Sequence, residues 1–565
     1  MKFKSLINDT LQEAFNKINI APELITVSDA SKPEFGDFQY NGIMAIAKKL
    51  GSNPRDIASL LVDNIHSDMI SKVEVAGPGF VNIHIDNSWL GNQVTNIFKS
   101  ENFTIEKNQN PKTVLIDYSG PNMAKEMHVG HLRSTIIGDS LANLFEFLGE
   151  NVIRQNHIGD WGTQFGMLIA YLEEVQQNSN FDELKNLENF YKLAKKRFDE
   201  DVAFANKARE YVVKIQSGDK HCLELWQKFI NISLSHCDEV YEKLGINLTK
   251  DNVRAESFYN DLLPIIISKL EASGLLKISD GAKCVFLPNS ETPIIVQKSD
   301  GGYLYATTDL AAINYRNDIL KVDRVCYVVD ARQSEHFSGV FWVAKESGLC
   351  KQDVLLEHIA FGTMMDKSGK PFKTRDGGTV KLVDLLDEAI VRAKDTINDR
   401  ANFADEEIEK LAKTIGIGAV KYSDLSINRE SNYIFDWDKM LSFDGNTSLY
   451  MQYAYARIQS ILNKFDSEIF GNIELQSDIE HKLAIMLLGF EDILNRAAND
   501  ATPHTITSYL YDLATIFMRF YEQSPILKDD IPTDIKMSRL MLSSITARTI
   551  KKGLEILGIE VVDRL

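Results

Sequence analysis

The stretch "TVLIDYSGPNMAKEMHVGHLRSTIIGDSLANLFEFLG", residues 113–149, decides the fold expected for this chain. It opens on a short apolar run, residues 113–118, of the kind that forms a buried parallel strand. Apolar residues from Leu132 to Leu148 then recur at helical spacing, and Gly149 stands where a C-cap glycine is expected. The pattern therefore predicts a strand, a turn and a helix, with the turn at the carboxyl edge of a parallel sheet, where ligands of such sheets bind.

Two histidines, His128 and His131, fall in the predicted turn. Residues three apart share a helix face, so both imidazoles can point to one spot beside the unpaired N–H groups of the helix N-terminus. Such a spot favours an anion, above all a phosphate. Gly130 between them leaves room for a flat base or a phosphate to approach the backbone. Two ordinary surface histidines are the plain alternative, but the position directly after a strand favours a functional pair.

Beyond this unit, strand-like runs at 284–288, 293–298, 324–329 and 354–362 alternate with helical stretches. That alternation predicts an α/β fold with a doubly wound Rossmann-type core. A highly charged helical pattern at about 170–260 indicates an inserted helical segment.

The two ends of the chain have different patterns. Residues near the N-terminus mix helical patterning with the alternating "GFVNIHI" at 79–85, which predicts an α+β domain. The last 120 or so residues show helical patterning only, and predict an all-helical domain. We expect four parts: an N-terminal domain (1–110), the Rossmann-type domain (111–385), a helical junction (386–445) and a helical C-terminal domain (446–565).

Composition sets the class of protein. With 565 residues, 44% of them hydrophobic and 25% charged, the chain fits a globular protein of two to four domains. No apolar run approaches the roughly eighteen residues of a membrane span, and the N-terminus lacks the apolar core of a signal peptide. Five cysteines without a CxxC pattern suit a reducing compartment. We therefore expect a cytoplasmic protein without membrane association.

A structural metal is not expected. The pairs His221–Cys222 and His236–Cys237 suggest zinc ligands at first sight. If the residues between them form one helix, the pairs lie about 22 Å apart. One zinc ion cannot bridge that distance.

The net charge of −18 argues by itself against a nucleic-acid partner, because neutralising phosphates requires Lys and Arg. A net charge does not exclude a local basic patch, however. The C-terminal stretch holds a group of basic residues that could form such a patch: Lys536, Arg539, Arg548, Lys551 and Lys552. A solvated helix face is the plain alternative for this group.

HVGH matches the HIGH motif of class I aminoacyl-tRNA synthetases. Together with "YLYATTDLAA" (303–312), "VVDARQSEHF" (328–337) and the C-terminal "SLYMQYAYARIQSIL" (448–462), it makes the chain resemble the arginyl-tRNA synthetase family over essentially its whole length. The resemblance implies a monomeric ligase that activates L-arginine with ATP and Mg²⁺ to arginyl-adenylate. The arginyl group then passes to the 3′ end of tRNA(Arg). It also implies an extra tRNA-contacting N-terminal domain and a C-terminal anticodon-binding domain.

The resemblance assigns the phosphate-binding residues. His128 and His131 would donate to the phosphates of ATP in the transition state. The KMSKS lysine of the wider class has no counterpart, because "PFKTRDG" at 371–377 holds Asp376 at that position. The cations left for the role are Lys125, Lys370, Lys373 and Arg375, and the nucleotide-binding set is His128, Gly130, His131, Met364 and Lys373. A solvated basic hairpin is the plain alternative for residues 370–375.

Arginine recognition calls for carboxylates, which pair bidentately with a planar guanidinium. The resemblance points to Asn122, Glu256, Tyr305, Asp309 and Gln333. Tyr305 and Asp309 are four apart and would share a face of a helical turn. For Glu256 a plain surface acid remains an alternative. Asp160 and Trp161 in "HIGDWG" fit a functional or a structural role equally well.

Three residues of the C-terminal domain are candidates for tRNA binding: Tyr450, Tyr453 and Arg457. They can supply the stacking and charge that single-stranded bases require. At helical spacing, most aromatics of this stretch are expected in the core.

Two other functions stay open at this point. A small-molecule nucleotidyltransferase shares the HxGH turn but does not need a helical domain of this size. A catalytically inactive RNA-binding relative would be expected to lose a motif histidine or Asp309, and this chain retains all three.

Overall fold

The computed structural model describes residues 2–176, 187–288, 290, 292–372, 380–398 and 403–565. The chain divides into two compact units. The first holds residues 1–107, 443–555 and 560–565, and the second holds residues 108–442 and 556–559. No helix within the described ranges is long and apolar enough to cross a membrane.

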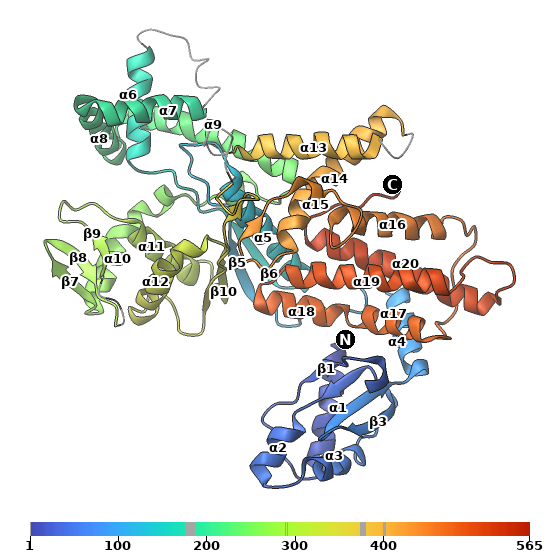
Figure 1. Ribbon diagram of the computed structural model, residues 1–565. Coiled ribbons are helices and arrows are strands. Elements are labelled where there is room, and N and C mark those ends of the chain that lie inside the picture. The colour runs from blue at the N-terminus through green and yellow to red at the C-terminus, as the bar shows by residue number, and fades with distance from the viewer. Residues whose placement is uncertain (1, 177–186, 289, 291, 373–379, 399–402) are drawn as a thin grey trace. The chain divides into compact units, whose positions relative to one another are not determined.

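The second unit is built on a four-stranded parallel sheet of order β11–β10–β5–β6 (Figure 1). Its strands are β5 (Thr113–Asp117), β6 (Asn151–Gln155), β10 (Arg324–Tyr327) and β11 (Leu355–His358). Helix α5 (Val129–Phe147) connects β5 to β6, after which the chain crosses to the other side of β5 to form β10. The carboxyl ends of β5 and β10 therefore meet where the strand order reverses, which is where open α/β sheets bind ligands. The predicted Rossmann-type core is confirmed.

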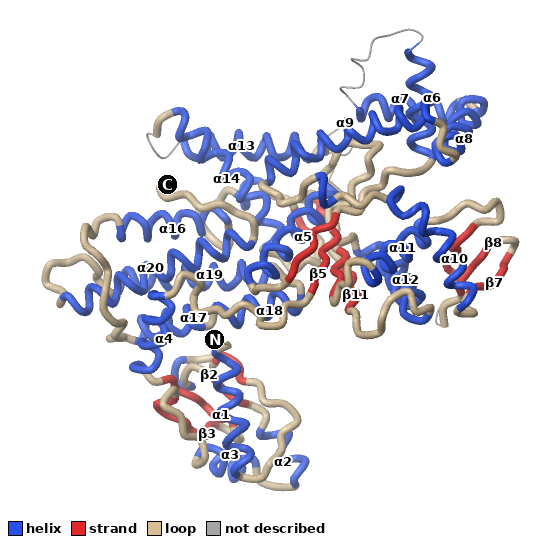
Figure 2. Tube along the Cα trace, turned by 180° about the vertical axis from the view of Figure 1, so that it is seen from behind, coloured by secondary structure: helices blue, strands red, loops and turns tan. Residues whose placement is uncertain are grey.

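Helices cover both sides of this sheet, with α5 on one side and α11 (Tyr305–Asp318) and α12 (Ser334–Glu346) on the other (Figure 2). A cluster of apolar side chains fills the core between the sheet and helices α11 and α12. Leu115 of β5 and Val325 of β10 are buried in one cluster with Leu310 and Val340 of these helices. The carboxyl ends of the strands are thus held by close packing.

Two of the predicted core strands are not part of the parallel sheet. β8 (Ala282–Val285) and β9 (Ile294–Gln297) form a separate antiparallel sheet with β7 (Leu276–Ser279), in the order β7–β8–β9. The prediction was wrong here because a short apolar run indicates a strand without indicating its partners. Both strands form hydrogen bonds with antiparallel neighbours in their own small sheet, and neither belongs to the parallel sheet of the Rossmann-type core.

The inserted helical segment is confirmed. It consists of α6 (Thr163–Gln176), α7 (Leu187–Glu200), α8 (Val202–Gln216) and α9 (Lys220–Leu244). Both His–Cys pairs lie on the single helix α9, and the five cysteines are all free and buried. The remaining elements of this unit are η3 (Lys250–Asn252), η4 (Glu256–Leu262), α10 (Leu263–Ala272), η5 (Ala331–Gln333), β12 (Met364–Met365), α13 (Leu382–Asn398), α14 (Asp405–Leu425), β13 (Tyr433–Ile434) and α15 (Trp437–Met440).

The first unit combines an N-terminal α+β part with a helical C-terminal part, both as predicted. The N-terminal part has an antiparallel sheet of order β1–β2–β4–β3. Its elements are α1 (Phe3–Lys17), β1 (Val27–Asp29), η1 (Pro33–Phe35), β2 (Phe38–Tyr40), α2 (Ile43–Leu50), α3 (Pro54–Val62), β3 (Ile70–Ala76), β4 (Phe80–Ile85) and α4 (Asn87–Lys99). The helical part consists of α16 (Ser448–Leu462), α17 (Asp478–Leu488), α18 (Phe490–Asp500), α19 (His504–Gln523) and α20 (Thr533–Ile556).

These two parts are joined by hydrogen bonds between segments that are distant in sequence. The Lys4 N–H donates to Asp492 Oδ2 over 2.9 Å, and Arg548 Nη1 donates to the Phe98 carbonyl over 3.0 Å. The N-terminal and helical parts therefore form one unit although more than 300 residues separate them in the chain.

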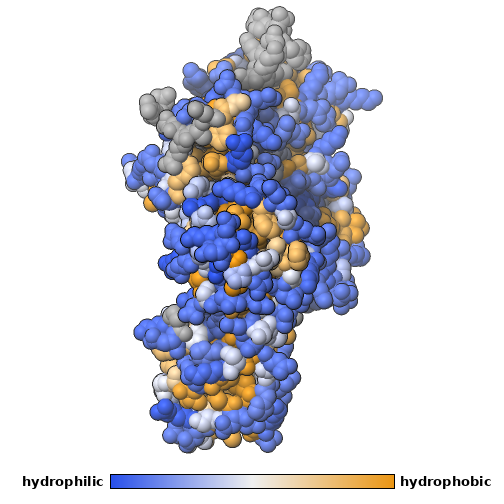
Figure 3. Space-filling model, turned by 90° about the vertical axis from the view of Figure 1, so that its right-hand side faces the viewer, coloured by the Kyte–Doolittle hydropathy of each residue, from blue (hydrophilic) through white to orange (hydrophobic). Residues whose placement is uncertain are grey.

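The face in Figure 3 is mainly hydrophilic, in keeping with the charge composition.

Candidate active site

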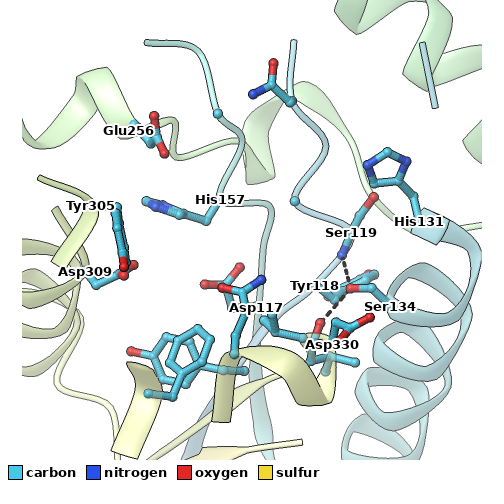
Figure 4. A pocket seen from close by; sticks show the side chains of 18 of the residues that line it. Asp117, Tyr118, Ser119, His131, Ser134, His157, Glu256, Tyr305, Asp309 and Asp330 are labelled. Carbon is cyan, nitrogen blue, oxygen red and sulfur yellow. Dashed lines mark hydrogen bonds between the residues drawn. The ribbon is translucent and has the colours of Figure 1, made fainter. Parts of the chain in front are cut away.

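A pocket of about 430 Å³ lies at the carboxyl ends of β5 and β10 (Figure 4). The last residue of β5, Asp117, lines it together with Ser119 of the following loop. The last residue of β10, Tyr327, lines it together with Asp330. The pocket is thus at the edge of the sheet that the sequence indicated.

The two motif histidines cap helix α5 reciprocally. The Gly130 N–H donates to His128 Nδ1, and the His128 N–H donates to His131 Nδ1, each over 3.1 Å. Because both Nδ1 atoms accept, the proton of each neutral imidazole is at Nε2. Burial and the neighbouring His128 lower the pKa of His131 to about 3. His131 is therefore a neutral N–H donor at physiological pH.

Gly130 has a reason to be glycine that the sequence did not show. A Cβ at this position would lie 2.8 Å from Cε1 of His128. The glycine thus makes room for the His128 ring, in addition to any room that it leaves for a ligand. Both Gly130 and His131 line the pocket.

All five residues expected to bind arginine line this one pocket: Asn122, Glu256, Tyr305, Asp309 and Gln333. Tyr305 and Asp309 lie in the first turns of α11 and share a face, as their spacing predicted. Figure 4 shows them with Glu256 at one end of the pocket, while His131 and Ser119 lie at the other. The pocket therefore has an acidic end and an end at a helix N-terminus.

The acidic end is electrostatically strained without a cation. Burial, followed by the negative charges of Asp160 and Asp309, raises the pKa of Glu256 to about 7. Like charges that share a desolvated site oppose one another's ionisation. A bound cation would relieve this repulsion, so the acidic end fits a positively charged group of a ligand.

One residue at the acidic end, His336, was not predicted from the sequence. His336 Nε2 lies 2.6 Å from Asp309 Oδ2, and its ring centroid lies 4.7 Å from that of Tyr305. His336 follows Gln333 by three residues in the same motif. This spacing, about one helical turn, could have indicated that His336 lies near the pocket. His157 and Asp117 also line the pocket, and the position of Asp117 at the end of a strand was a signal as well.

Lys125 and Lys370, the two expected cations that the structure describes, are not among the residues that line the pocket. Lys125 is exposed, and its Nζ lies 4.7 Å from the ring centroid of Tyr191 in α7. Lys370 is exposed in a turn in which its backbone N–H donates to Asp366 Oδ1 over 3.0 Å. Met364 is buried in β12, where it pairs with Tyr433.

Lys373, Arg375 and Asp376 lie outside the described residues. The chain that follows them returns to the histidine turn, because the Val129 N–H donates to the Val380 carbonyl over 3.1 Å. Lys381 next to it is 2.8 Å from Glu126.

The candidate tRNA-binding residues share one partly exposed side of α16. Tyr450, Tyr453 and Arg457 are half-buried, whereas Tyr455 is buried in the core. The Arg457 guanidinium lies 4.9 Å from the ring centroid of Tyr521. Only Tyr455 of the three tyrosines of this stretch is buried, so the expectation that most of them lie in the core was wrong.

Comparison with known proteins identifies the family. Residues 93–437 match the catalytic domain of class I tRNA synthetases of the arginine type, and residues 1–85 match the arginyl tRNA synthetase N terminal domain. Residues 451–565 match the DALR anticodon binding domain. The chain belongs to the arginyl-tRNA synthetase family.

Individual relatives agree with this assignment over their full lengths. The chain is 50% identical to the arginine–tRNA ligase of Laribacter hongkongensis and 48% identical to that of Alteromonas mediterranea, covering 100% of both chains in each case. Its fold is similar to the crystal structure of the arginyl-tRNA synthetase of Plasmodium falciparum, with a TM-score of 0.88, 33% identity and 100% and 99% coverage. The Thermus thermophilus arginyl-tRNA synthetase has the same fold, with a TM-score of 0.85, 24% identity and 100% coverage of both chains.

Proposed function

We propose that this chain is an arginine–tRNA ligase whose activation chemistry takes place in the pocket between β5 and β10. It activates L-arginine with ATP to arginyl-adenylate and transfers the arginyl group to the 3′ end of tRNA(Arg), releasing AMP and pyrophosphate. The observation that carries the proposal is the polarity of the pocket, which joins a desolvated acidic end to a helix N-terminus with a neutral histidine donor.

Arginine would enter with its guanidinium at the acidic end. Asp309 can accept two guanidinium N–H groups, and a desolvated guanidinium–carboxylate pair is strong and geometrically specific. His336 Nε2 contacts Asp309 Oδ2 and so fixes the plane of the carboxylate. The substrate cation favours the ionised form of Glu256 and offsets the repulsion between the carboxylates of the acidic end.

With the guanidinium so placed, the arginine carboxylate points toward the N-terminus of α5. One of its oxygens attacks the α-phosphorus of ATP, and the bond from that phosphorus to the bridging oxygen of pyrophosphate breaks. No protein nucleophile is required, so the protein contributes positioning and stabilisation of charge. His128 and His131 donate Nε2–H bonds to phosphate oxygens, and Gly130 borders the nucleotide.

Two neutral imidazoles stabilise the departing pyrophosphate less than a cation does. We assign the missing positive charge to Lys125, Lys370, Lys373 and Arg375, together with Mg²⁺ that accompanies ATP. Among the residues that the structure describes, no group of three His, Cys, Asp or Glu side chains is arranged to hold a metal ion. Mg²⁺ would accompany the phosphates of the nucleotide, which is its usual mode in such sites.

We assign tRNA binding to the N-terminal domain (1–110) and to the helical domain (446–565), with Tyr450, Tyr453 and Arg457 contacting unpaired bases. The half-buried aromatics and the guanidinium of α16 have the chemistry that stacks bases. The junction (386–445) connects the helical domain to the catalytic domain (111–385). We expect the enzyme to act as a monomer in the cytoplasm.

ATP–pyrophosphate exchange with each amino acid in turn, with and without tRNA(Arg), tests the function. Among the amino acids, we expect only arginine to support exchange. We expect tRNA(Arg) to stimulate that exchange. Exchange that depends on another small acceptor would favour a nucleotidyltransferase. A chain that binds tRNA but exchanges with no amino acid would be the inactive relative.

A further inference from the structure

The loop after β6 holds a buried acid that the mechanism above does not use. Asp160, in "HIGDWG", is only 2% exposed. Its Oδ1 accepts the Ser257 N–H over 2.9 Å, and its Oδ2 accepts the Ser257 hydroxyl. Ser257 follows Glu256 directly, so both oxygens of Asp160 are bound to the segment that carries the pocket acid.

The same loop holds this segment through its backbone. The Glu256 N–H donates to the Ile158 carbonyl over 3.1 Å, and the Arg254 N–H donates to the Asn156 carbonyl over 3.0 Å. The loop itself is fixed by α9, because Trp226 Nε1 donates to the Asp160 carbonyl over 2.8 Å. The loop that contains Asp160 therefore fixes the backbone at Glu256 and, with it, the direction in which the Glu256 side chain points.

We propose that Asp160 is the positioning residue for Glu256: its carboxylate aims Glu256 into the arginine pocket, and its negative charge controls the charge state of Glu256. The inference rests on the proposed role of Glu256 in binding arginine. It assigns Asp160 a part in specificity without direct contact with the substrate.

The charged and titratable groups that face Glu256 influence its ionisation. Burial first, then Asp160 from the β6 loop and Asp309 from α11, raise its pKa to about 7. His336 contacts Asp309, and His157 and Tyr305 line the same end of the pocket. With Asp160 neutralised, one of the two named charges is gone, and the pKa of Glu256 moves down toward its ordinary value.

Arginine binding should depend on pH through the ionisation of Glu256. The guanidinium of arginine stays protonated throughout the working range, so the substrate binds better when Glu256 is ionised. The KM for arginine should therefore be lowest above pH 7 and should rise as pH falls through the pKa of Glu256, by up to about tenfold per pH unit. Lowering that pKa moves the rise to lower pH.

Asp160→Asn tests the inference, because asparagine keeps the shape and can still accept the Ser257 N–H. We expect the rise of the arginine KM in tRNA aminoacylation to move to lower pH, relative to the parent enzyme. Above pH 7, loss of positioning should raise the arginine KM by about tenfold, with the KM for ATP within about twofold. An unchanged midpoint, or equal changes in both KM values, would overturn the inference.

Three further variants test separately the positioning by Ser257, the effect of an unrelated acid and the role of Glu256. Ser257→Ala removes one hydrogen bond but keeps the charge of Asp160, so the arginine KM should rise while the midpoint stays. Asp261→Asn removes an exposed acid from the same η4 and should change neither quantity. Glu256→Gln should raise the arginine KM and abolish the pH transition.

The outcomes of Glu256→Gln and Asp160→Asn distinguish the two levels of the proposal. If Glu256→Gln leaves the arginine KM and its pH profile unchanged, the proposed role of Glu256 is wrong. If it abolishes the transition while Asp160→Asn leaves the midpoint in place, only the role of Asp160 is wrong. If Asp160→Asn does not fold, Ser257→Ala decides the positioning role: equal changes in the KM values for arginine and ATP would refute it.

Discussion

At the scale of single residues, the acidic end of the pocket depends on pairs that bring together distant parts of the chain. Asp309 and His336 are 27 positions apart and 2.6 Å apart in space. The histidine contacts one carboxylate oxygen and so restricts the plane of the carboxylate that is proposed to bind the substrate. Such preorganisation lowers the entropic cost of binding a flexible, charged ligand.

Asp309→Ala tests the proposed contact of Asp309 with the guanidinium of arginine. Losing one partner of a desolvated charge pair costs about 2–5 kcal/mol, so arginine binding should weaken by that amount. The measurement is the KM for arginine in tRNA-supported exchange, with the KM for ATP as the internal reference. Asp318→Ala, a partly exposed acid near the other end of α11, is the matched control. An arginine KM equal to that of the parent would refute the assignment.

Lys125 lies on Tyr191 in this structure, although it is proposed to serve the phosphates. A cation–π contact at an exposed site is worth only about 0.5–1 kcal/mol, so leaving the ring costs little. Three residues before His128, the long ammonium side chain can reach the phosphates that the histidines address.

Lys125→Met should therefore lower the rate of activation by about 10²–10³-fold, the scale of losing one transition-state donor. Arginine binding should change little. The measurement is tRNA-supported ATP–pyrophosphate exchange at saturating arginine, with Lys370→Met made in parallel. A Lys125→Met rate within about threefold of the parent would transfer the role to Lys370 or Lys373.

At the scale of elements, α9 acts as a support for the loops of the active site. Ser119 has a φ of 72°, a left-handed conformation that is costly for a residue other than glycine. The Tyr241 hydroxyl of α9 lies 2.7 Å from Ser119 Oγ and accepts from Asn156 Nδ2 over 3.0 Å. Ser233 of the same helix donates to the Met123 carbonyl. The helical insertion thus holds the strained loop between β5 and the histidine turn.

Tyr241→Phe should destabilise the protein and slow activation together. Removing the hydroxyl leaves the buried Asn156 Nδ2 without its acceptor and takes one partner from Ser119, at a cost of about 1–3 kcal/mol. Melting temperature and the activation rate are the two measurements. Tyr211→Phe is the control: this buried tyrosine of α8 bonds Glu173, so it should lower stability without slowing activation. Equal effects of the two substitutions on activation would contradict the supporting role of α9.

At the scale of the whole molecule, each unit is assembled from separate stretches of chain. The N-terminal and helical parts share one unit, and residues 556–559 belong to the catalytic unit. Asn143 Nδ2 donates to the Ile556 carbonyl over 3.4 Å, and a Cβ on Gly558 would lie 2.7 Å from Lys421 Nζ. A cut at a domain boundary of the sequence therefore also removes a piece of the catalytic unit.

The fragment 108–442 should accordingly fold, but with a lower melting temperature than the full chain. Because it lacks the domains proposed to bind tRNA, its tRNA affinity should fall by about 10²–10⁴-fold, the scale of losing a second binding region. Thermal melts, titration of tRNA binding and the rate of tRNA charging are the measurements, with the full chain as reference. A fragment that charges tRNA at the rate of the full chain would refute this division of labour.

The sequence by itself determined the features that depend on near neighbours. The strand, turn and helix of 113–149, the placement of the histidines and the shared face of Tyr305 and Asp309 all follow from backbone geometry and side-chain periodicity. Family resemblance then supplied residues, such as Glu256 and Gln333, that periodicity alone does not single out. The structure places every member of the arginine set in one pocket.

The tertiary structure decided what depends on distant contacts. The separate sheet of β8 and β9, the position of Lys125 on Tyr191, the contact of His336 with Asp309 and the hold of Asp160 on Ser257 each join residues with no shared local pattern. The charge state of Glu256 belongs to the same class, because it arises from burial and from two acids elsewhere in the chain. Periodicity records which face of an element is buried, whereas desolvation and Coulomb interactions depend on distances in space that only the folded chain sets.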